Sequence, residues 1–157
     1  MSEAISRIRS FQVDHDLLDP GFYISRKDGD IITYDLRTRK PNAGDYMDNP
    51  TMHSVEHMFA TYIRNSAIKD DVVYFGPMGC QTGFYLVVQK QTPQTVFAET
   101  LRVVEQILAH EGAVFGASRK ECGHYENLSL EAAKIEMQRY YEVLSKWEDM
   151  TYAYRKE

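Results

Sequence analysis

Hydrophobic patterns of two different periods follow one another along this chain, and their order limits the folds it can adopt. Three long segments repeat apolar residues every three or four positions, as a helix with one buried face does. The shorter apolar runs between them are typical of strands. Because strands and long helices are mixed in order, the sequence predicts an α+β fold, a single domain in which several helices pack against an antiparallel sheet.

Each of the three predicted helices begins at a capping signal. Asn49-Pro50 resembles an N-cap followed by proline at the first helical position, and this helix should run to about Ala67. Thr92-Pro93 should open a second helix that Gly112 ends, and Ser129 should cap the last one. The residues expected to face the core are Val55, Phe59 and Tyr62 or Ile63, then Phe97, Leu101, Val104 and Leu108, then Leu130, Ala133, Met137, Tyr140, Leu144 and Trp147.

The predicted strands are apolar runs bounded by turn residues. Residues 21–37 should form a hairpin, because Asp28-Gly29 between apolar arms is a strong turn signal. The runs 72–75 and 82–89 should be buried strands joined by a glycine-rich turn. Residues 11–15 alternate weakly and suggest one further short strand.

Composition excludes several classes of protein. The 157 residues suit one compact domain, and with a formal net charge of −5 and scattered Lys and Arg we expect no nucleic-acid partner. The chain has no run of about 18 apolar residues and no apolar signal segment near its start, so we expect a cytoplasmic protein without a membrane partner. Two cysteines, Cys80 and Cys122, are too few for a disulfide scaffold. In a reducing compartment such a pair suggests metal binding or catalysis.

The segment His53-Ser54-Val55-Glu56-His57 carries the strongest chemical signal. Two histidines four residues apart on a helix lie on one face, so both rings can reach one metal ion. The glutamate fits the H-x-x-E-H arrangement, in which it can act as a general base without being a ligand. Such histidine pairs also occur on solvated helix surfaces. Val55 and Phe59 should be buried on the opposite side, however, so the polar side should face a partner that satisfies it.

A third ligand is available in Cys122. A thiolate with two imidazoles leaves one coordination position open for water or substrate, as in catalytic sites. Gly123 beside it lets the backbone turn the sulfur toward the helix. Spacing alone does not decide between Cys122 and Cys80, and His124 and Glu126 also compete. Either cysteine could instead be a small buried residue.

Three other residues gain meaning only in combination. Cys80 lies in the glycine-rich turn 76–81, where a substrate can approach the backbone closely. A cysteine near a metal can act as a base or nucleophile, although a core cysteine explains this segment equally well. His15 and Arg37, taken alone, are typical of surface or paired polar residues.

These segments occur together in the order and with the gaps of one known family. They are Phe11…Asp14-His15, Asp35-Leu36-Arg37…Pro41-Asn42, His53-Ser54-Val55-Glu56-His57, Gly76-Pro77-Met78-Gly79-Cys80-Gln81-Thr82-Gly83-Phe84-Tyr85 and Glu121-Cys122-Gly123. The combination resembles the S-ribosylhomocysteine lyase family, which makes the precursor of the signal autoinducer-2. The likeness spans nearly the whole chain, so the expected domain is residues 1–157. The pattern P-M-G-C-x-T-G-[FY]-Y together with H-x-x-E-H is highly specific.

The resemblance implies a carbon–sulfur lyase that cleaves S-ribosyl-L-homocysteine to L-homocysteine and 4,5-dihydroxy-2,3-pentanedione. The metal of the family is ferrous iron, for which zinc or cobalt can substitute, and the matching ligands are His53, His57 and Cys122. Cys80 and Glu56 match the two acid–base residues of the family. The reaction is a migration of the sugar carbonyl followed by β-elimination of homocysteine.

The resemblance also implies where substrate binds and how the chains assemble. Ser10, His15 and Arg37 match positions that line the substrate site. The family forms homodimers in which each site draws residues from both chains. The chain departs from the family pattern at Tyr74 and Gly76, where other members carry Asp and Ser, and this removes any carboxylate role there.

Two alternatives from other functional classes remain. In a metallohydrolase, Glu56 would activate a water molecule on the metal, and Cys80 would have no task. In a metal-binding regulator, His53, His57, Cys80 and Cys122 would close the site with four ligands, and Glu56 would have no task.

Overall fold

The strands form one antiparallel sheet in the computed structural model, which describes residues 4–156. Within those residues the sheet has four strands in the order β1-β2-β4-β3. Their bounds are β1 Gly21–Asp28, β2 Ile31–Arg37, β3 Val72–Pro77 and β4 Gly83–Gln89. The hairpin 21–37 is confirmed, with Gly29 at φ 64° in the turn, a conformation that glycine adopts without strain. The predicted α+β class is confirmed as well.

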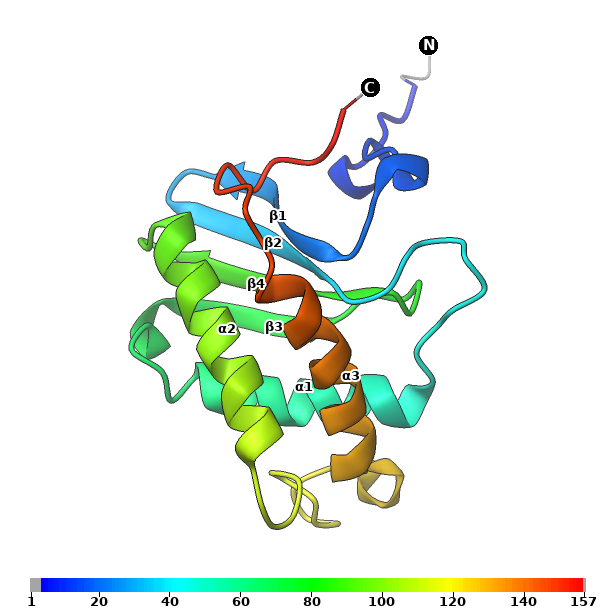
Figure 1. Cartoon of the computed structure of the whole chain (residues 1–157), viewed down its shortest axis with the longest axis vertical. Coiled ribbons are helices and arrows are strands. Elements are labelled where there is room, and N and C mark those ends of the chain that lie inside the picture. Colours follow the sequence, from blue (N-terminus) through cyan, green and yellow to red (C-terminus); the bar gives the residue numbers. More distant parts are fainter. Residues whose placement is uncertain (1–3, 157) are drawn as a thin grey trace.

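The helices pack against one face of this sheet (Figure 1). Among the described residues these are α1 (Asn49–Ile63), α2 (Pro93–Ala109) and α3 (Leu130–Leu144). Thr92 and Ser129 cap α2 and α3 as predicted, each accepting a hydrogen bond from a backbone N–H three residues on. The cap of α1 is Asp48 rather than Asn49, and the helix ends at Ile63 instead of near Ala67. After Ile63 the chain continues in hydrogen-bonded turns over residues 64–68.

Most of the expected core positions are buried. Val55 and Phe59 on α1 are 0% and 1% exposed, and Phe59 stacks on Phe75 of the sheet. On α2 the buried face is turned from the expected one, because Val103 and Ile107 point inward while Leu101 and Leu108 are only partly buried. The core therefore lies between the three helices and the inner face of the sheet.

The strand expected at residues 11–15 is wrong. Two short 3-10 turns, Arg9–Phe11 and His15–Leu17, occupy this region instead. The Asp14 side chain accepts a hydrogen bond from the Asp16 backbone N–H, a local bond that competes with strand pairing. The weak alternation of apolar residues does not reflect a buried face, since Phe11 is 65% exposed.

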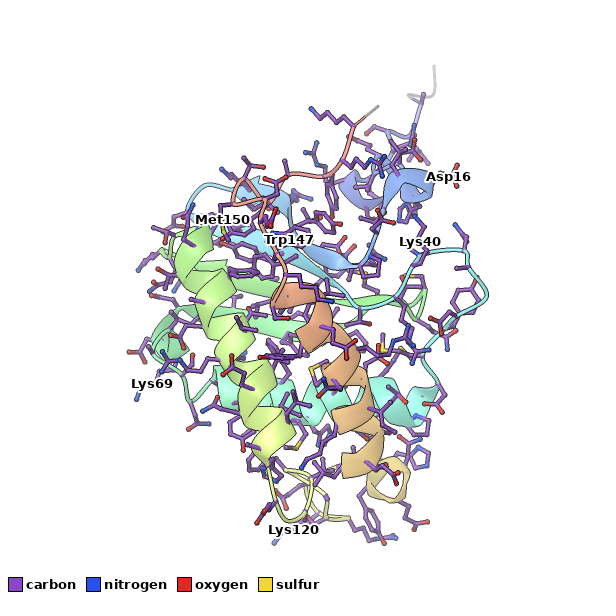
Figure 2. All side chains as sticks on the ribbon, in the orientation of Figure 1. Asp16, Lys40, Lys69, Lys120, Trp147 and Met150 are labelled. Carbon is purple, nitrogen blue, oxygen red and sulfur yellow. The ribbon has the colours of Figure 1, made fainter. Side chains whose placement is uncertain are left out.

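The outer face of the sheet is approached by both ends of the described chain (Figure 1). After α3 the chain returns along β1, where the Ile24 backbone N–H donates to the Tyr152 carbonyl at 2.7 Å. Trp147, labelled in Figure 2, packs edge-on against Tyr23 and leaves no room for a side chain at Gly21. None of the helices within residues 4–156 has the length and apolar character needed to cross a membrane.

Candidate metal centre and thiol site

Helix α1 places the two histidines of the H-x-x-E-H segment side by side. The His53 and His57 ring centroids are 4.6 Å apart, and the rings are nearly perpendicular. Both are half-buried, while Val55 and Phe59 on the opposite side of the helix anchor it in the core. The predicted placement of the histidines on one helix face is therefore confirmed.

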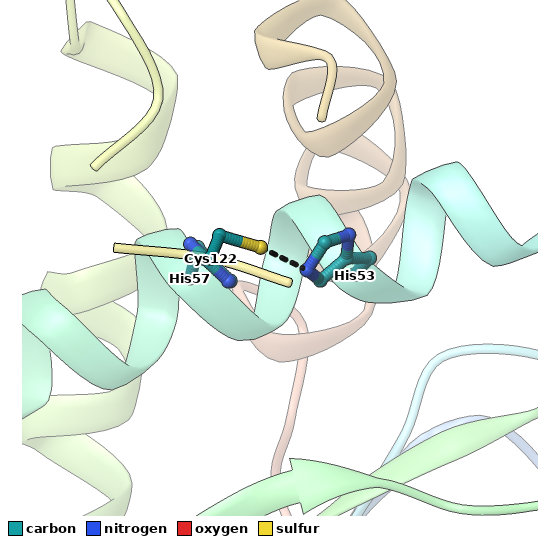
Figure 3. Close-up of side chains that lie close together, drawn as sticks. All are labelled: His53, His57 and Cys122. Atoms are coloured by element: carbon teal, nitrogen blue, oxygen red, sulfur yellow. Dashed lines mark hydrogen bonds between the residues drawn. The ribbon is translucent and has the colours of Figure 1, made fainter. Parts of the chain in front are cut away.

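Cys122 completes this group from the loop that precedes α3. One ligand atom each from His53, His57 and Cys122 lies within 4.8 Å of the others, the geometry of a group that could hold a metal ion. Figure 3 shows the Cys122 sulfur between the two rings, 3.3 Å from Nε2 of His53. Of the candidates that spacing left open, the structure places Cys122 beside the histidines; Cys80, His124 and Glu126 are not in the group found among the described residues.

Oxygen acceptors orient both imidazoles. Nδ1 of His53 is 2.7 Å from Oδ1 of Asn127, and Nδ1 of His57 is 2.8 Å from the Phe115 carbonyl oxygen. Because these oxygens accept hydrogen bonds, each ring carries its proton on Nδ1 and directs an Nε2 lone pair to the shared point. Two imidazoles and a thiol suit a divalent metal of borderline softness, so the residues present fit the expected cofactor.

Asn127 and Phe115 were not foreseen from the sequence. Gly116 was also missed: its φ is +70°, and a Cβ there would lie 3.1 Å from Nδ1 of His57. The only local signal is a glycine next to an apolar residue in a loop, and this does not indicate that Gly116 contacts His57.

Glu56 borders an open cavity beside the metal group. The cavity measures about 570 Å³ and is lined by Glu56, His57, Ala60, Thr61, Phe75, Phe115, Gly116 and Glu121. Glu56 is therefore near the histidines and reachable by a small molecule. Its role as acid or base remains a prediction.

Cys80 lies in the β3–β4 turn and is exposed. Its sulfur is 3.1 Å from the Thr82 hydroxyl oxygen and 3.6 Å from Nη1 of Arg37. Gln81 fixes the turn: its carbonyl accepts from the Met47 backbone N–H at 2.9 Å, and its side-chain amide donates to the Met47 carbonyl at 2.7 Å. Gln81 has φ +67°, so this turn holds the backbone in a left-handed conformation next to the thiol.

Arg37 is buried beside that thiol. Its guanidinium donates from Nε and Nη2 to the two carboxylate oxygens of Asp35 at 3.1 and 2.7 Å, and from Nη1 to the Thr82 hydroxyl at 2.8 Å. Burial opposes the charge of the guanidinium, but Asp35 and then the Cys80 sulfur favour it, so the pKa of Arg37 lies above its ordinary value. A fixed positive charge therefore lies next to the sulfur.

The other two predicted substrate residues belong to the N-terminal turns. Burial raises the pKa of the Tyr85 hydroxyl, and a side-chain hydrogen bond with Ser10 partly offsets this. Tyr85 pairs with Asp35 across the sheet, which places Ser10 on the same outer face as Arg37. His15 is half-buried, and its Nδ1 bonds the Val13 carbonyl at 2.9 Å. Their binding of substrate remains a prediction.

The predicted site residues thus fall into two groups. The hydrogen bonds of Cys80 join it to Arg37 and Thr82, and it does not belong to the His53–His57–Cys122 group. Figure 1 shows the β3–β4 turn at one end of the sheet and the yellow loop before α3 at the bottom of the molecule. A closed metal site with four ligands including Cys80 is therefore not formed within residues 4–156 of one chain.

Tyr74 and Gly76 are sterically linked on β3. They are two residues apart on β3, so both side chains project from the same side of the strand. The Tyr74 ring lies over Gly76, and a Cβ at position 76 would collide with its hydroxyl. The absence of a side chain at position 76 therefore accommodates the tyrosine.

Comparison with known proteins gives a consistent result. The model of the S-ribosylhomocysteinase (LuxS) family matches residues 8–151. A protein of Finegoldia magna named S-ribosylhomocysteine lyase is 38% identical over 146 residues, which cover 90% of this chain and 93% of that protein. Proteins of the same name from Borrelia garinii subsp. bavariensis and Clostridium acetobutylicum are 37% and 40% identical, over 90% and 82% of this chain and 94% and 85% of their own lengths.

Proposed function

The chain belongs to the S-ribosylhomocysteinase (LuxS) family, and on this premise we propose that it cleaves the thioether of S-ribosyl-L-homocysteine. The products would be L-homocysteine and 4,5-dihydroxy-2,3-pentanedione. The observation that carries the proposal is the likeness to relatives named S-ribosylhomocysteine lyase over about 90% of the chain. The chain is accordingly a carbon–sulfur lyase.

One divalent metal per chain would be held by His53, His57 and Cys122. We propose ferrous iron as the native ion, with zinc and cobalt as substitutes, since two imidazoles and a thiolate accept all three. When bound, the metal would act as a Lewis acid on carbonyl and hydroxyl oxygens of the sugar. The Nδ1 contacts of both histidines support this assignment because they leave Nε2 as the nitrogen available to a metal, and Nε2 of His53 already faces the Cys122 sulfur.

Cys80 and Glu56 would carry the proton transfers. The Cys80 thiolate would take a proton from one sugar carbon and return it to the next, so that the carbonyl moves from C1 to C2 and then to C3. Loss of the C4 proton, with Glu56 as base, would then expel homocysteine from C5 by β-elimination. The Arg37 guanidinium, 3.6 Å from the sulfur, supports this role because a positive charge stabilises a thiolate.

We further propose a homodimer with sites shared between chains. The argument is that Cys80 and the metal group lie in different parts of one chain, whereas the proposed reaction needs both beside one sugar. Large apolar side chains exposed on Phe11 and Tyr74 offer surface for such an interface. A single lyase domain over residues 1–157 and a cytoplasmic location stay predictions.

The activity is tested by thiol release. The protein is loaded anaerobically with ferrous iron or cobalt, given S-ribosyl-L-homocysteine and followed with a thiol-reactive dye. Cys80→Ala should keep its metal and lose turnover, whereas Cys122→Ala should lose the metal. S-adenosyl-L-homocysteine serves as a control, because it has a similar thioether but no free sugar carbonyl. A fully active Cys80→Ala protein would refute the proposed role of Cys80 in proton transfer.

Shared sites are tested by mixing the two inactive variants. If sites combine residues from both chains, Cys80→Ala and Cys122→Ala subunits should together form one complete site per mixed dimer and recover part of the wild-type activity. A mixture of Cys80→Ala with the double variant should stay inactive. No recovery after demonstrated subunit exchange would place each site within one chain.

A further inference from the structure

The hydrogen bonds around Cys80 continue into the segment that follows α3. The Tyr154 hydroxyl donates to Oδ2 of Asp35 at 2.7 Å, and the same oxygen accepts from Nη2 of Arg37 at 2.7 Å. Asp35 is 1% exposed, so these protein groups replace water around its carboxylate. An unbroken line of contacts therefore runs from Tyr154 through Asp35 and Arg37 to Thr82 and Cys80.

We infer that Tyr154 is a positioning residue: its hydroxyl holds the Asp35 carboxylate, which in turn holds the Arg37 guanidinium against the Cys80 thiol. The inference rests on the proposed role of Cys80 in proton transfer. It assigns a task in that site to a residue more than 70 positions away from Cys80 along the chain.

The surroundings of Tyr154 keep its hydroxyl in place. Its ring stacks on Tyr23 with centroids 5.1 Å apart, and the backbone of Tyr152 pairs with Ile24 on β1. Burial, and next the nearby Asp35 charge, raise the pKa of Tyr154 far above its ordinary value. The hydroxyl therefore remains a hydrogen-bond donor wherever the enzyme works.

The Asp35 carboxylate needs this third donor. Arg37 binds both of its oxygens, but the carboxylate can still pivot about its own side-chain bond and carry the guanidinium with it. Without Tyr154, Oδ2 of Asp35 would keep only Nη2 of Arg37, and water would not replace the lost bond because the carboxylate is buried. Arg37 has no other acidic partner recorded within residues 4–156, so a pivot of Asp35 would move Nη1 away from the sulfur.

A matched control lies two residues earlier. Tyr152 belongs to the same segment and is 1% exposed, but its hydroxyl contacts the Met150 sulfur instead of Asp35. Tyr152→Phe and Tyr154→Phe thus each remove one phenolic hydroxyl from the same segment. Only Tyr154→Phe removes a hydrogen bond of the chain of contacts that leads to Cys80. If Tyr154 merely anchors the segment, the two variants should behave alike.

The test measures the chemistry of the thiol directly. Each metal-loaded protein is alkylated with iodoacetamide over a range of pH, and labelling of Cys80 is quantified by peptide mass spectrometry, alongside thermal unfolding and steady-state kinetics. Tyr154→Phe should slow Cys80 alkylation near neutral pH by about tenfold and lower kcat by about tenfold, with a smaller rise in KM. Tyr152→Phe should leave both unchanged.

Wild-type alkylation rates in Tyr154→Phe, or equal slowing in both variants, would overturn the inference. The alkylation measurement needs no turnover. Absence of thiol release from S-ribosyl-L-homocysteine by the wild type would therefore refute the proposed function, while slower alkylation in Tyr154→Phe alone would still support the line of contacts.

Discussion

Asn127 and Phe115 each provide an oxygen that hydrogen-bonds Nδ1 of one histidine, His53 and His57 respectively. These bonds leave Nε2 as the nitrogen that each ring can offer to a metal. An imidazole whose Nδ1–H is held by an oxygen has its lone pair on Nε2 and cannot rotate freely. The two acceptors differ in kind, since the Phe115 carbonyl belongs to the backbone whereas the Asn127 amide can be removed by substitution. The orientation of His53 is therefore open to a direct test.

Asn127→Ala should weaken metal binding by roughly 10- to 100-fold, the usual cost of losing a hydrogen bond that orients a ligand. The measurement is competition with a chromophoric chelator under anaerobic conditions. Asn65→Ala is the control, because Asn65 bonds a backbone carbonyl at the far end of α1 and is exposed. Equal affinities in the two variants would show that Asn127 does not orient His53.

Tyr74 and Gly76 should be energetically coupled. Gly76→Ser forces the Tyr74 ring to move, because a Cβ at position 76 would meet its outer atoms, and since the ring is 53% exposed and can turn into solvent we expect a loss of about 0.5 kcal/mol in unfolding free energy. In a Tyr74→Ala background the same serine should cost less. Urea denaturation of the four proteins of this cycle measures the difference. An identical cost in both backgrounds would refute the steric explanation.

At the scale of elements, the start of α1 matters most for the metal group, because His53 and His57 both lie within the first turns of this helix. The Asp48 side chain accepts from the Thr51 backbone N–H at 2.9 Å, although the sequence indicated Asn49 as the cap. Both residues are good caps, and a proline after them is compatible with either register. Only the backbone of the folded loop decides which one takes the position.

Asp48→Ala should therefore lower the unfolding free energy by about 1 kcal/mol, while Asn49→Ala should have little effect. Thermal or urea denaturation of the metal-free proteins isolates the cap from any effect of metal binding. The reverse order of effects would mean that Asn49 caps the helix in solution.

The elements that could be predicted from sequence are those defined by neighbouring residues. The hairpin around Gly29 and the caps Thr92 and Ser129 depend on contacts only a few positions apart. The prediction of a strand at 11–15 failed because the hydrogen bond from the Asp16 backbone N–H to the Asp14 side chain is as local as the alternation that suggested a strand.

Residue patterns predicted which types of side chain make up the site, but not the long-range hydrogen bonds that hold them. The spacing of His53 and His57 fixes their common helix face. The third metal-site residue and the orienting amide come from about 70 positions away, and hydrophobic periodicity carries no information about such contacts. The Tyr154–Asp35 bond spans an even greater distance along the chain.

At the scale of the whole molecule, an ion cluster that is buried at Glu136 and partly exposed at Asp45 and Arg139 ties α3 to the loop between β2 and α1. Glu136 on α3 is 0% exposed and accepts from Arg39, which also pairs with Asp45. Arg139 on α3 binds the same aspartate. Because that loop also carries Met47, which holds Gln81 next to Cys80, the cluster links the helical layer to the thiol.

This cluster should make stability sensitive to acid. The hydrogen bond from Arg139 is the main reason that the pKa of Asp45 is lower than its ordinary 3.8. A carboxyl whose pKa is lower in the folded state stabilises that state above the unfolded pKa, and the contribution is lost as pH falls through the folded value. Asp45→Asn should thus be less stable than wild type at neutral pH, and the gap should close below about pH 4.

Urea denaturation at a series of pH values measures that gap, with Asp70→Asn, an exposed aspartate before β3, as the control. The pair with Arg139 is part-exposed, so the gap at neutral pH should stay near 1 kcal/mol or below. A gap that persists unchanged in acid would mean that Asp45 acts through packing instead of charge.

Buried phenols should make the molecule sensitive to alkali as well. Burial raises the pKa of Tyr23 to about 12 and is also the chief cause of raised values at Tyr34, Tyr85, Tyr140, Tyr152 and Tyr154. A group whose folded pKa lies above its unfolded pKa contributes stability that is fully present below the unfolded value, here 10.0, and is lost as pH rises through the folded value. The unfolding free energy should therefore decline steadily above pH 10.

The measurement is phenolate absorbance of folded and urea-unfolded protein between pH 10 and about 12. The folded protein should release fewer phenol protons at each pH, and the missing protons should appear together with the loss of helical circular dichroism, since Tyr34 and Tyr152 pack against Phe22 in the core between the helices and the sheet. Superimposable titrations of the two states would mean that water already reaches these hydroxyls in the folded protein. That result would also remove the dry surroundings on which the bond between Tyr154 and Asp35 depends.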